Sequence, residues 1–273
     1  MKIEFFDSHA HYDDEKFDED REILIKTIYE SGITKFVSAG YNVKSSKKGL
    51  ELAHQNSYIY TISGISPNDV ENTIEKTDEQ IKNIENLVCE EINNSKKENR
   101  LSKIVAIGEI GLDYYWNKEN KEIQQYAFIE QIKLANKYNL PIVIHTREAV
   151  MDTLEILKNI QPANNKGIFH CCPLNRELVK EGLKLGFYIS FAGPVTFKNS
   201  KNAEEIVQMV PLDKILIETD SPYLAPEPKR GTRNDSRNVK YIAEKIAQIK
   251  GMDISEIADI TYKNAMRIFN MHI

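Results

Sequence analysis

Short apolar runs alternate with longer amphipathic stretches along the whole chain. The apolar runs are rich in Ile, Val, Phe and Tyr, and several are apolar throughout, which is typical of parallel strands covered on both faces. They predict strands at residues 2–7, 35–40, 58–65, 103–110, 141–145, 167–170, 187–193 and 214–220. Apolar residues at helical spacing predict helices at 20–30, 122–138, 152–160, 178–185, 237–250 and 255–269.

This alternation predicts a parallel sheet with crossover helices. Eight repeats of strand and helix indicate an α/β fold of the (β/α)8 TIM-barrel type. A chain of 273 residues suits one barrel, so we expect a single domain, 1–273. The polar stretch at 93–102 is interpreted as a surface loop within that domain.

Histidines and carboxylates stand where the predicted strands end. The set comprises His9 and His11 after the first strand, Glu109 after the fourth, His145 after the fifth, His170 after the sixth and Asp220 after the eighth. The carboxyl ends of barrel strands form one mouth, where active sites lie. Each residue alone has an ordinary explanation, such as a helix cap or a hydrogen-bonded structural histidine. Their joint placement predicts that the six side chains converge.

Imidazoles and carboxylates without a thiolate suit zinc or manganese and, with water as a further ligand, magnesium. Six ligands exceed the number that one catalytic ion with an open position requires. The sequence therefore predicts two divalent metal ions with Glu109 as the bridging ligand. The expected sets are His9, His11 and Asp220 for one ion, and His145 and His170 for the other. Asp7 is expected to orient a ligating histidine from behind.

Other polar residues fall outside this pattern. His54, in a helical stretch, and His272, at the end of the chain, are interpreted as surface residues. The three cysteines form no C-x-x-C pair, and Cys171 and Cys172 are interpreted as small buried residues. This cysteine usage, with no signal peptide and no apolar run of membrane-spanning length, favours the cytoplasm. The net charge of -5 argues against a bulk nucleic-acid coat protein.

Several segments together resemble the TatD-type metal-dependent deoxyribonucleases, within the amidohydrolase-like barrels. They are DSHAH at 7–11, GEIGLDYY at 108–115, PIVIHTR at 141–147, FHC at 169–171, ETDSPYLAP at 218–226 and RGTRN at 230–234. The resemblance extends over residues 4–269. It implies a cytoplasmic, metal-dependent hydrolase acting on DNA, with 3′-to-5′ exonuclease activity in some members. The metal ligands that it implies are the same six residues.

The chain departs from the family pattern where a substrate would lie. The family has G-x-H-P after the third strand, whereas this chain has GISP, with Ser66 replacing the histidine that contacts phosphate. Arg147 and Arg230 are further candidates for phosphate contact, and Arg230 belongs to a basic run with Lys229, Arg233 and Arg237. A solvated loop explains that run equally well. The aromatic residues at 114–116 either pack or stack on unpaired bases.

The function expected from these features is hydrolysis of DNA phosphodiester bonds. Hydroxide on the metal ions attacks phosphorus, Glu109 bridges the ions, and Asp220 accepts the proton of the water. DNA is then the substrate, with a monomeric enzyme and no membrane or obligate protein partner. The alternative in the same class of site is an amide or ester hydrolase, such as an aminoacyl-tRNA deacylase, which Ser66 favours. A nucleic-acid-binding protein with a structural metal is a third possibility, and such a metal site normally has only four ligands.

Overall fold

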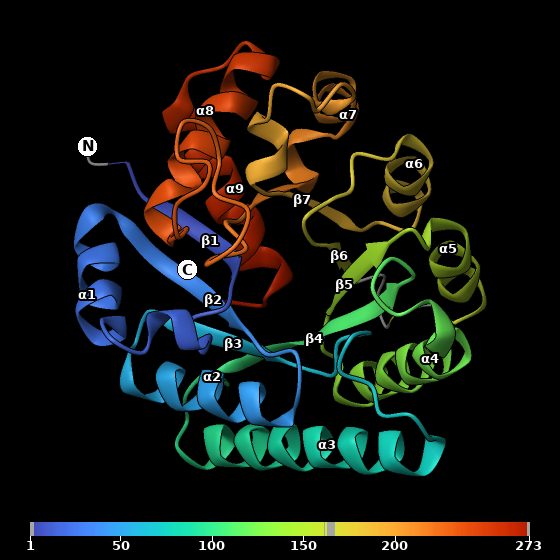
Figure 1. The fold of residues 1–273 in the computed structure, drawn as a ribbon. Coiled ribbons are helices and arrows are strands. Elements are labelled where there is room, and N and C mark those ends of the chain that lie inside the picture. Colours follow the sequence, from blue (N-terminus) through green and yellow to red (C-terminus); the bar gives the residue numbers. More distant parts are fainter. Residues whose placement is uncertain (1–2, 161, 163–166, 272–273) are drawn as a thin grey trace. The chain divides into compact units, whose positions relative to one another are not determined.

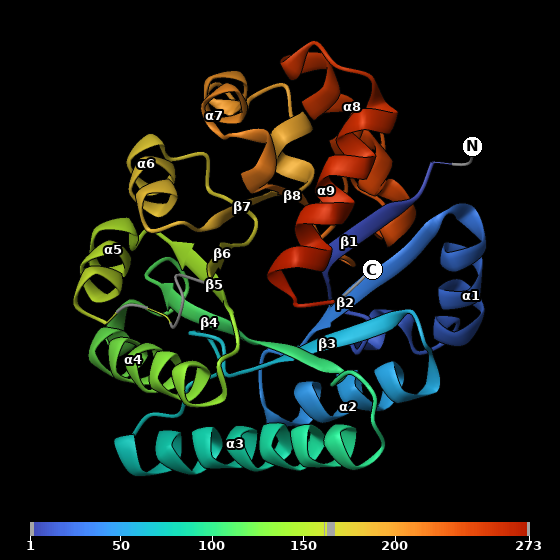
Figure 2. The same ribbon diagram turned by 180° about the vertical axis from the view of Figure 1, so that it is seen from behind.

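The structure is a computed structural model that describes residues 3–160, 162 and 167–271. Eight strands form one sheet in chain order, from β1 to β8 (Figures 1 and 2). The described pairs are all parallel: β1 with β2, β3 with β4, β4 with β5, β5 with β6, and β7 with β8. The last strand contacts the first, and just beyond its end the Asp220 amide donates to the carbonyl of His9 at 2.9 Å. The fold is the predicted (β/α)8 barrel.

The chain forms two compact units, 1–38 with 170–184 and 188–273, and 39–169 with 185–187. The first unit contains the strands β1 (Phe5–Ala10), β2 (Ile33–Ala39, except its last residue), β7 (Tyr188–Phe191) and β8 (Ile215–Ile217). Its helices are α1 (Arg21–Ser31), α6 (Arg176–Lys184), α7 (Ala203–Met209), α8 (Val239–Lys250) and α9 (Ile254–Ile268). Helix α9 packs on β1 and β8 and begins with a capping box between Asp253 and Glu256.

The second unit contains β3 (Ile59–Ser63), β4 (Ile104–Asp113), β5 (Ile142–Arg147) and β6 (Gly167–Phe169). Its helices are α2 (Val43–Gln55), α3 (Ile74–Lys97), α4 (Lys121–Tyr138) and α5 (Val150–Asn159). Helix α2 packs on β3, α4 packs on β4, and α3 contacts both helices. Short 3-10 turns connect the elements at Glu15–Phe17, Lys118–Asn120, Gly193–Thr196, Leu212–Lys214 and Ser236–Asn238. The boundary of one domain at 1–273 stays a prediction.

The predicted strand positions agree with the structure better than the predicted strand ends do. Strands β4 and β5 continue to Asp113 and Arg147, so Glu109 and His145 lie within strands rather than at their last residues. His9 likewise lies inside β1, while β8 ends at Ile217, three residues before Asp220. A run of apolar residues shows where a strand is buried, whereas the hydrogen-bonded length of the strand depends on the neighbouring strand.

The predicted loop at 93–102 is wrong over its first half, because α3 continues to Lys97. Two polar residues of this helix, Glu91 and Ser95, are buried against the rest of the second unit. Lys96 and Lys97 occupy its last turn, where positive charge complements the helix dipole. Tertiary contacts therefore extend a helix through residues that are polar in the sequence.

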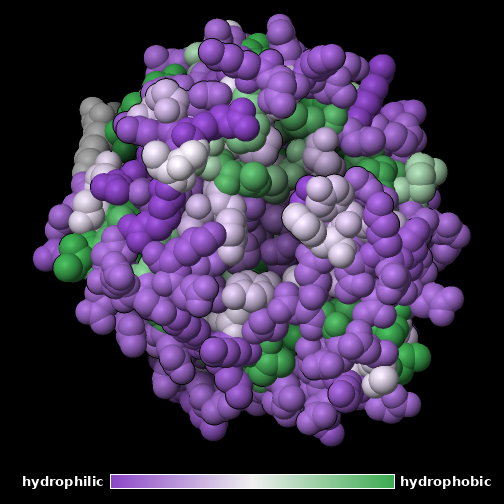
Figure 3. Space-filling model, viewed as in Figure 1, coloured by the Kyte–Doolittle hydropathy of each residue, from purple (hydrophilic) through white to green (hydrophobic). Residues whose placement is uncertain are grey.

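Apolar strand residues and the inner faces of the helices form the core, as the sequence pattern indicates. Figure 3 shows that the visible face is mainly hydrophilic, with hydrophobic side chains in small separate groups. Among the described residues, no helix combines the length and the apolar character needed to cross a membrane. His54 lies in α2 and is partly exposed, as expected, and it pairs with Glu91. The prediction for His272 lies outside the described residues.

Candidate metal centre

The junction of β1 with the segment after β8 forms the first group of ligands. The Asp220 amide donates to the His9 carbonyl, and the His11 amide donates to the Ser221 carbonyl at 2.6 Å. Asp220 has a φ of 56°, in the left-handed region that residues other than glycine rarely adopt. These backbone bonds fix the two segments together, so they bring residues from opposite ends of the sequence into one place.

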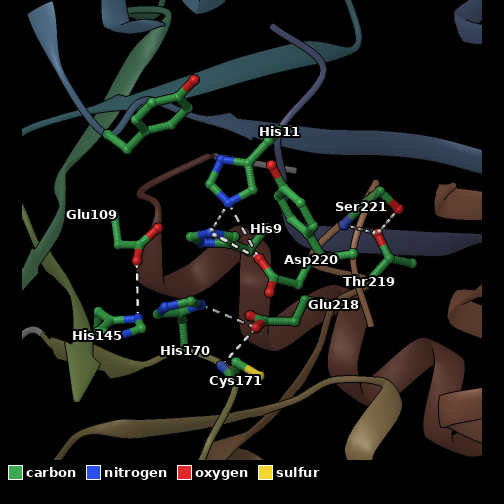
Figure 4. A network of polar contacts seen from close by, with 12 residues as sticks. His9, His11, Glu109, His145, His170, Cys171, Glu218, Thr219, Asp220 and Ser221 are labelled. Atoms are coloured by element: carbon green, nitrogen blue, oxygen red, sulfur yellow. Dashed lines mark hydrogen bonds and ion pairs between the residues drawn. The ribbon is translucent and has the colours of Figure 1, made fainter. Parts of the chain in front are cut away.

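The side chains of His9, His11 and Asp220 converge at this junction (Figure 4). The His9 Nε2 lies 3.3 Å from the His11 Nε2, and the Asp220 Oδ1 lies 3.7 Å and 3.2 Å from these two nitrogens. Ligand atoms about 2.0–2.2 Å from one ion lie about 3–3.5 Å from one another. The triangle of donor atoms therefore fits a divalent metal ion, and two imidazoles with a carboxylate suit zinc or manganese.

The charge of Asp220 is held in place by its neighbours. Burial opposes ionisation, but the hydrogen bond with His11 and the nearby His9 and His170 rings hold the pKa of Asp220 below its ordinary value. An ionised carboxylate does not have to lose a proton before it binds a cation, so Asp220 is ready to act as a metal ligand.

His170 lies in the same unit, directly after β6. Its ring stacks on that of His9, with 4.1 Å between centroids and 14° between planes. Its Nδ1 lies 3.4 Å from a carboxylate oxygen of Glu218, which is fully buried. Glu218 also accepts hydrogen bonds from the amide of Cys171, at 2.6 Å, and from the hydroxyl of Ser190. This carboxylate orients the imidazole from behind, a role that the sequence interpretation did not assign to it.

Asp7 contacts the backbone of His9 and the segments after β8. The Asp7 carboxylate accepts from the amide of His9, from the amide and hydroxyl of Thr219, and from the hydroxyl of Ser236. Burial raises the pKa of Asp7 to about 7, although these hydrogen bonds act in the opposite direction. Asp7 therefore joins β1 to the segments after β8.

The second group of candidate ligands lies in the second unit, on β4 and β5. The His145 Nδ1 lies 3.0 Å from Glu109, and its Nε2 lies 2.9 Å from the Asp113 Oδ2. Gly111 lies opposite His145 in the register, and a Cβ atom there would fall 2.0 Å from the carbonyl oxygen of His145. Only glycine permits this close approach of the two strands beside the ligands.

Asp113 is the residue that the sequence interpretation missed in this group. Burial tends to raise its pKa, but the hydrogen bond from His145 and the amide of Trp116 lower the pKa of Asp113 to about 2. Glu109 and Asp113 are four residues apart on one strand, so they share a face. If the strand had been predicted to continue past residue 110, the alternation of side chains between its two faces would have placed Asp113 on the face of Glu109.

The predicted substrate contacts have different surroundings. The hydroxyl of Ser66 donates to Asp69 at 2.8 Å, and Ser66 is buried. Arg230 is half-exposed, lies 3.9 Å from Glu227 and covers the ring of Phe197. Its neighbours in the basic run pair with acids: Arg233 with Asp20, and Arg237 with Asp235. This run is therefore largely neutralised by acidic residues. The surroundings of Arg147 are aromatic rings.

Comparison with known proteins identifies the family of the chain. A family model described as TatD related DNase matches residues 6–270. YabD of Bacillus subtilis, named an uncharacterized metal-dependent hydrolase, is 41% identical over 267 residues, which cover 98% of this chain and 99% of that protein. TatD of Erwinia tasmaniensis, named a 3′-5′ ssDNA/RNA exonuclease, is 29% identical over 272 residues, covering 97% of this chain and 100% of that protein.

Solved structures give the same result. The TatD homologue YJJV of Escherichia coli K12 is similar with a TM-score of 0.88 and 25% sequence identity, covering 99% of each chain. The match of the family model over nearly the whole sequence confirms the resemblance seen in the motifs. The chain belongs to the TatD-related DNase family and is a metal-dependent hydrolase.

Proposed function

We propose that this protein hydrolyses phosphodiester bonds of DNA and removes nucleotides from the 3′ end of a strand. The observation that carries the proposal is the buried triangle of His9, His11 and Asp220 donor atoms in a chain of the TatD-related family. The exonuclease named among the relatives supports the choice of substrate and direction.

The proposed metal site contains two divalent ions. His9, His11 and Asp220 would hold one ion, His145 and His170 would hold the other, and Glu109 would be shared between them. The support is the placement of these residues at or near the carboxyl ends of β1, β4, β5, β6 and β8, the ends at which (β/α)8 enzymes carry their active sites. Zinc, magnesium or manganese fits the donor set. When bound, such ions lower the pKa of water and stabilise negative charge on the phosphate.

The residues of the chain have separate tasks in this reaction. Asp220 accepts the proton of the attacking water at a carboxylate oxygen, because it is the acidic group of the His9–His11 triangle. Glu218 and Asp113 hold the His170 and His145 rings in one orientation. The Nδ1 atom of His145 also lies 3.0 Å from the Glu109 carboxylate, so the ring helps to orient that carboxylate.

Arg147 and Arg230 are the proposed contacts for substrate phosphates. Both guanidinium groups lie over aromatic rings, at 3.9 Å for Arg147 over Tyr115 and 4.2 Å for Arg230 over Phe197. Planar guanidinium groups bind phosphate through two parallel hydrogen bonds. Ser66 contributes less, since its hydroxyl already donates to Asp69.

The surroundings of Ser66 favour a second candidate, hydrolysis of an aminoacyl ester on tRNA. This position offers a neutral hydroxyl beside a carboxylate rather than a cation for phosphate. Attack on a carbonyl carbon uses the same metal ions and the same proton acceptor. The two candidates differ only in the electrophile that the site receives.

One panel of substrates distinguishes the candidates. Purified, metal-loaded protein is incubated with 3′-labelled and 5′-labelled oligodeoxynucleotides and with aminoacyl-tRNA, each with and without EDTA. We expect EDTA-sensitive loss of the 3′ label from DNA and no deacylation. EDTA-sensitive deacylation without DNA cleavage would establish the second candidate instead, and no hydrolysis of either substrate would contradict both.

We also propose that the protein acts as a cytoplasmic monomer. All three cysteines are free thiols, which fits a reducing compartment. Size-exclusion chromatography with light scattering tests the monomer, and a mass of two chains would contradict it.

A further inference from the structure

Three side chains form an exposed cluster after β4 and at the end of β5. The Arg147 guanidinium carbon lies 3.9 Å from the centre of the Tyr115 ring and 5.4 Å from that of Trp116. The two aromatic rings meet edge to face, with centroids 4.8 Å apart. Trp116 is 68% exposed and Tyr115 is 44% exposed, whereas the adjacent Tyr114 is buried. Of the three consecutive aromatic residues at 114–116, the first therefore packs in the interior and the other two expose their rings.

Arg147 differs from Arg233 and Arg237 of the basic run after β8. Arg233 and Arg237 each bind a carboxylate, with Asp20 and Asp235 as partners. Within the described part of the chain, the side-chain contacts of Arg147 are the two aromatic rings, and no carboxylate pairs with it. The rings orient the guanidinium while leaving its charge uncompensated, so the cluster attracts anions.

The cluster is tied to a ligand histidine through one carboxylate. The Asp113 Oδ1 accepts from the amides of Tyr115, at 2.9 Å, and of Trp116, at 3.0 Å. Its Oδ2 lies 2.9 Å from the His145 Nε2. Asp113 also faces Arg147 in the register of β4 and β5. A ligand held by the two rings is thus fixed in position relative to His145.

We propose that Tyr115, Trp116 and Arg147 form a docking platform for the unpaired end of a nucleic-acid strand. An exposed ring stacks on a base, and Arg147 binds an adjacent phosphate. Stacking on a protein ring requires a free base face, which an unpaired terminal nucleotide offers and a base inside a duplex does not. The uncompensated positive charge matches the phosphate. This proposal rests on the proposed function and assigns the recognition of the strand end to these three residues.

Trp116 makes the proposal directly measurable, because it is the only tryptophan in the chain. Its fluorescence is recorded while metal-loaded protein is titrated with a short phosphorothioate-linked oligothymidylate, which resists cleavage. We expect saturable quenching by the single strand, and binding on the order of tenfold weaker for a blunt duplex of the same length. Equal quenching by the duplex, or none by the single strand, would overturn the proposal.

Variants test whether the oligothymidylate binds at the cluster of Tyr115, Trp116 and Arg147. Arg147→Ala is expected to weaken the titration on the order of tenfold, since it removes both the phosphate contact and a stacked neighbour. Arg176→Ala is the matched control, because Arg176 is an exposed arginine of α6 that pairs with Glu205. We expect it to bind as the wild type does. If Arg147→Ala binds as tightly as the control, the platform is wrong; if Arg147→Ala does not fold, the wild-type comparison of single strand with duplex decides alone.

The fluorescence result and the hydrolysis result are separable. Turnover of oligonucleotides without Trp116 quenching would overturn the platform and leave the proposed function intact. Saturable quenching without turnover would support the platform and contradict the nuclease proposal. An RNA oligomer of the same length is the third arm: weaker quenching by RNA supports DNA as the occupant, and equal quenching supports recognition of base and phosphate without regard to the sugar.

Discussion

The two groups of candidate ligands are held by different means. The group of His9, His11 and Asp220 is buried, and Asp7 connects its segments by accepting hydrogen bonds from amides and hydroxyls. The group of Glu109 and His145 includes a ring that is 22% exposed, with Asp113 behind it. Asp113 also fixes the exposed loop of Tyr115 and Trp116.

This difference suggests a division of labour. Carboxylates that bind mainly amides and hydroxyls hold the backbone, and their loss acts first on folding. A carboxylate that binds the imidazole itself sets the orientation and basicity of a ligand, and its loss acts first on metal affinity. The first group would then supply a rigid anchor, and the second would couple the metal ions to the substrate.

Loss of the ligand charge in the first group gives the largest expected effect. Asp220→Asn removes the charge of a proposed metal ligand that is also the proposed proton acceptor, so we expect hydrolysis to fall about 10³-fold. Asp259→Asn is the matched control, since Asp259 is an exposed aspartate of α9 paired with Lys263. Initial rates on a labelled oligodeoxynucleotide measure both. Equal rates for the two variants would remove Asp220 from the mechanism.

The carboxylate behind His145 should have an intermediate effect. Asp113→Asn weakens the bond to the ring and replaces one acceptor of the loop amides, so we expect metal affinity to fall about 10–100-fold. Activity is measured against the concentration of added divalent ion. Full activity at wild-type ion concentrations would show that Asp113 serves the fold alone, and the contrast between the groups would then disappear.

Asp7 tests the other half of the contrast. Asp7→Asn presents an NH2 group to donors that now meet a carboxylate, so we expect the free energy of unfolding to fall by about 2–3 kcal/mol. Urea unfolding followed by circular dichroism measures it. A variant that unfolds at the wild-type urea concentration but binds metal poorly would assign Asp7 to the ligands and not to the backbone.

A buried carboxylate in α3 provides a reference without ligands nearby. Glu91 binds Arg100, at 2.6 Å, and the amide of Lys103, at 2.7 Å. Burial opposes ionisation, but these contacts lower the pKa of Glu91 below its ordinary 4.5. A lowered folded-state pKa stabilises the protein above the unfolded value, and that stability is lost as the pH falls through the folded value.

Glu91→Gln should therefore cost about 1–2 kcal/mol of unfolding free energy at neutral pH, and this difference should shrink below about pH 4.5. Urea unfolding of both proteins across this range measures it, with metal affinity as the second readout. We expect metal affinity to stay unchanged. A difference in stability that is independent of pH would show that the ion pair contributes little.

The comparison also shows how far a sequence specifies such a site. His9, His11 and Asp220 were predictable because alternation and strand order bring the ends of strands to one side of a parallel sheet. Asp113 was missed because β4 is longer than its apolar run. Glu218 had no predicted role, since its contact with His170 depends on the approach of two segments distant in the sequence.

The basic run after β8 shows the same limit for charges. Arg233 and Arg237 follow Arg230 closely in the sequence and suggest a phosphate-binding loop. Asp20, which neutralises Arg233, comes from the start of α1 and is more than two hundred residues away. Which of these arginines can bind an anionic ligand therefore depends on the acidic residues that the fold places beside them. Arg147, whose described side-chain contacts are aromatic rings, stays a proposed phosphate contact together with Arg230.

The most direct test of the account is the number of metal ions that each chain binds. Metal-free protein is dialysed against zinc or manganese, and the bound metal is measured by mass spectrometry alongside the protein concentration. The account predicts two ions per wild-type chain and one for His11→Ala, with an unchanged circular dichroism spectrum. A folded wild-type chain that binds no metal, or a His11→Ala variant that still binds two ions, would contradict it.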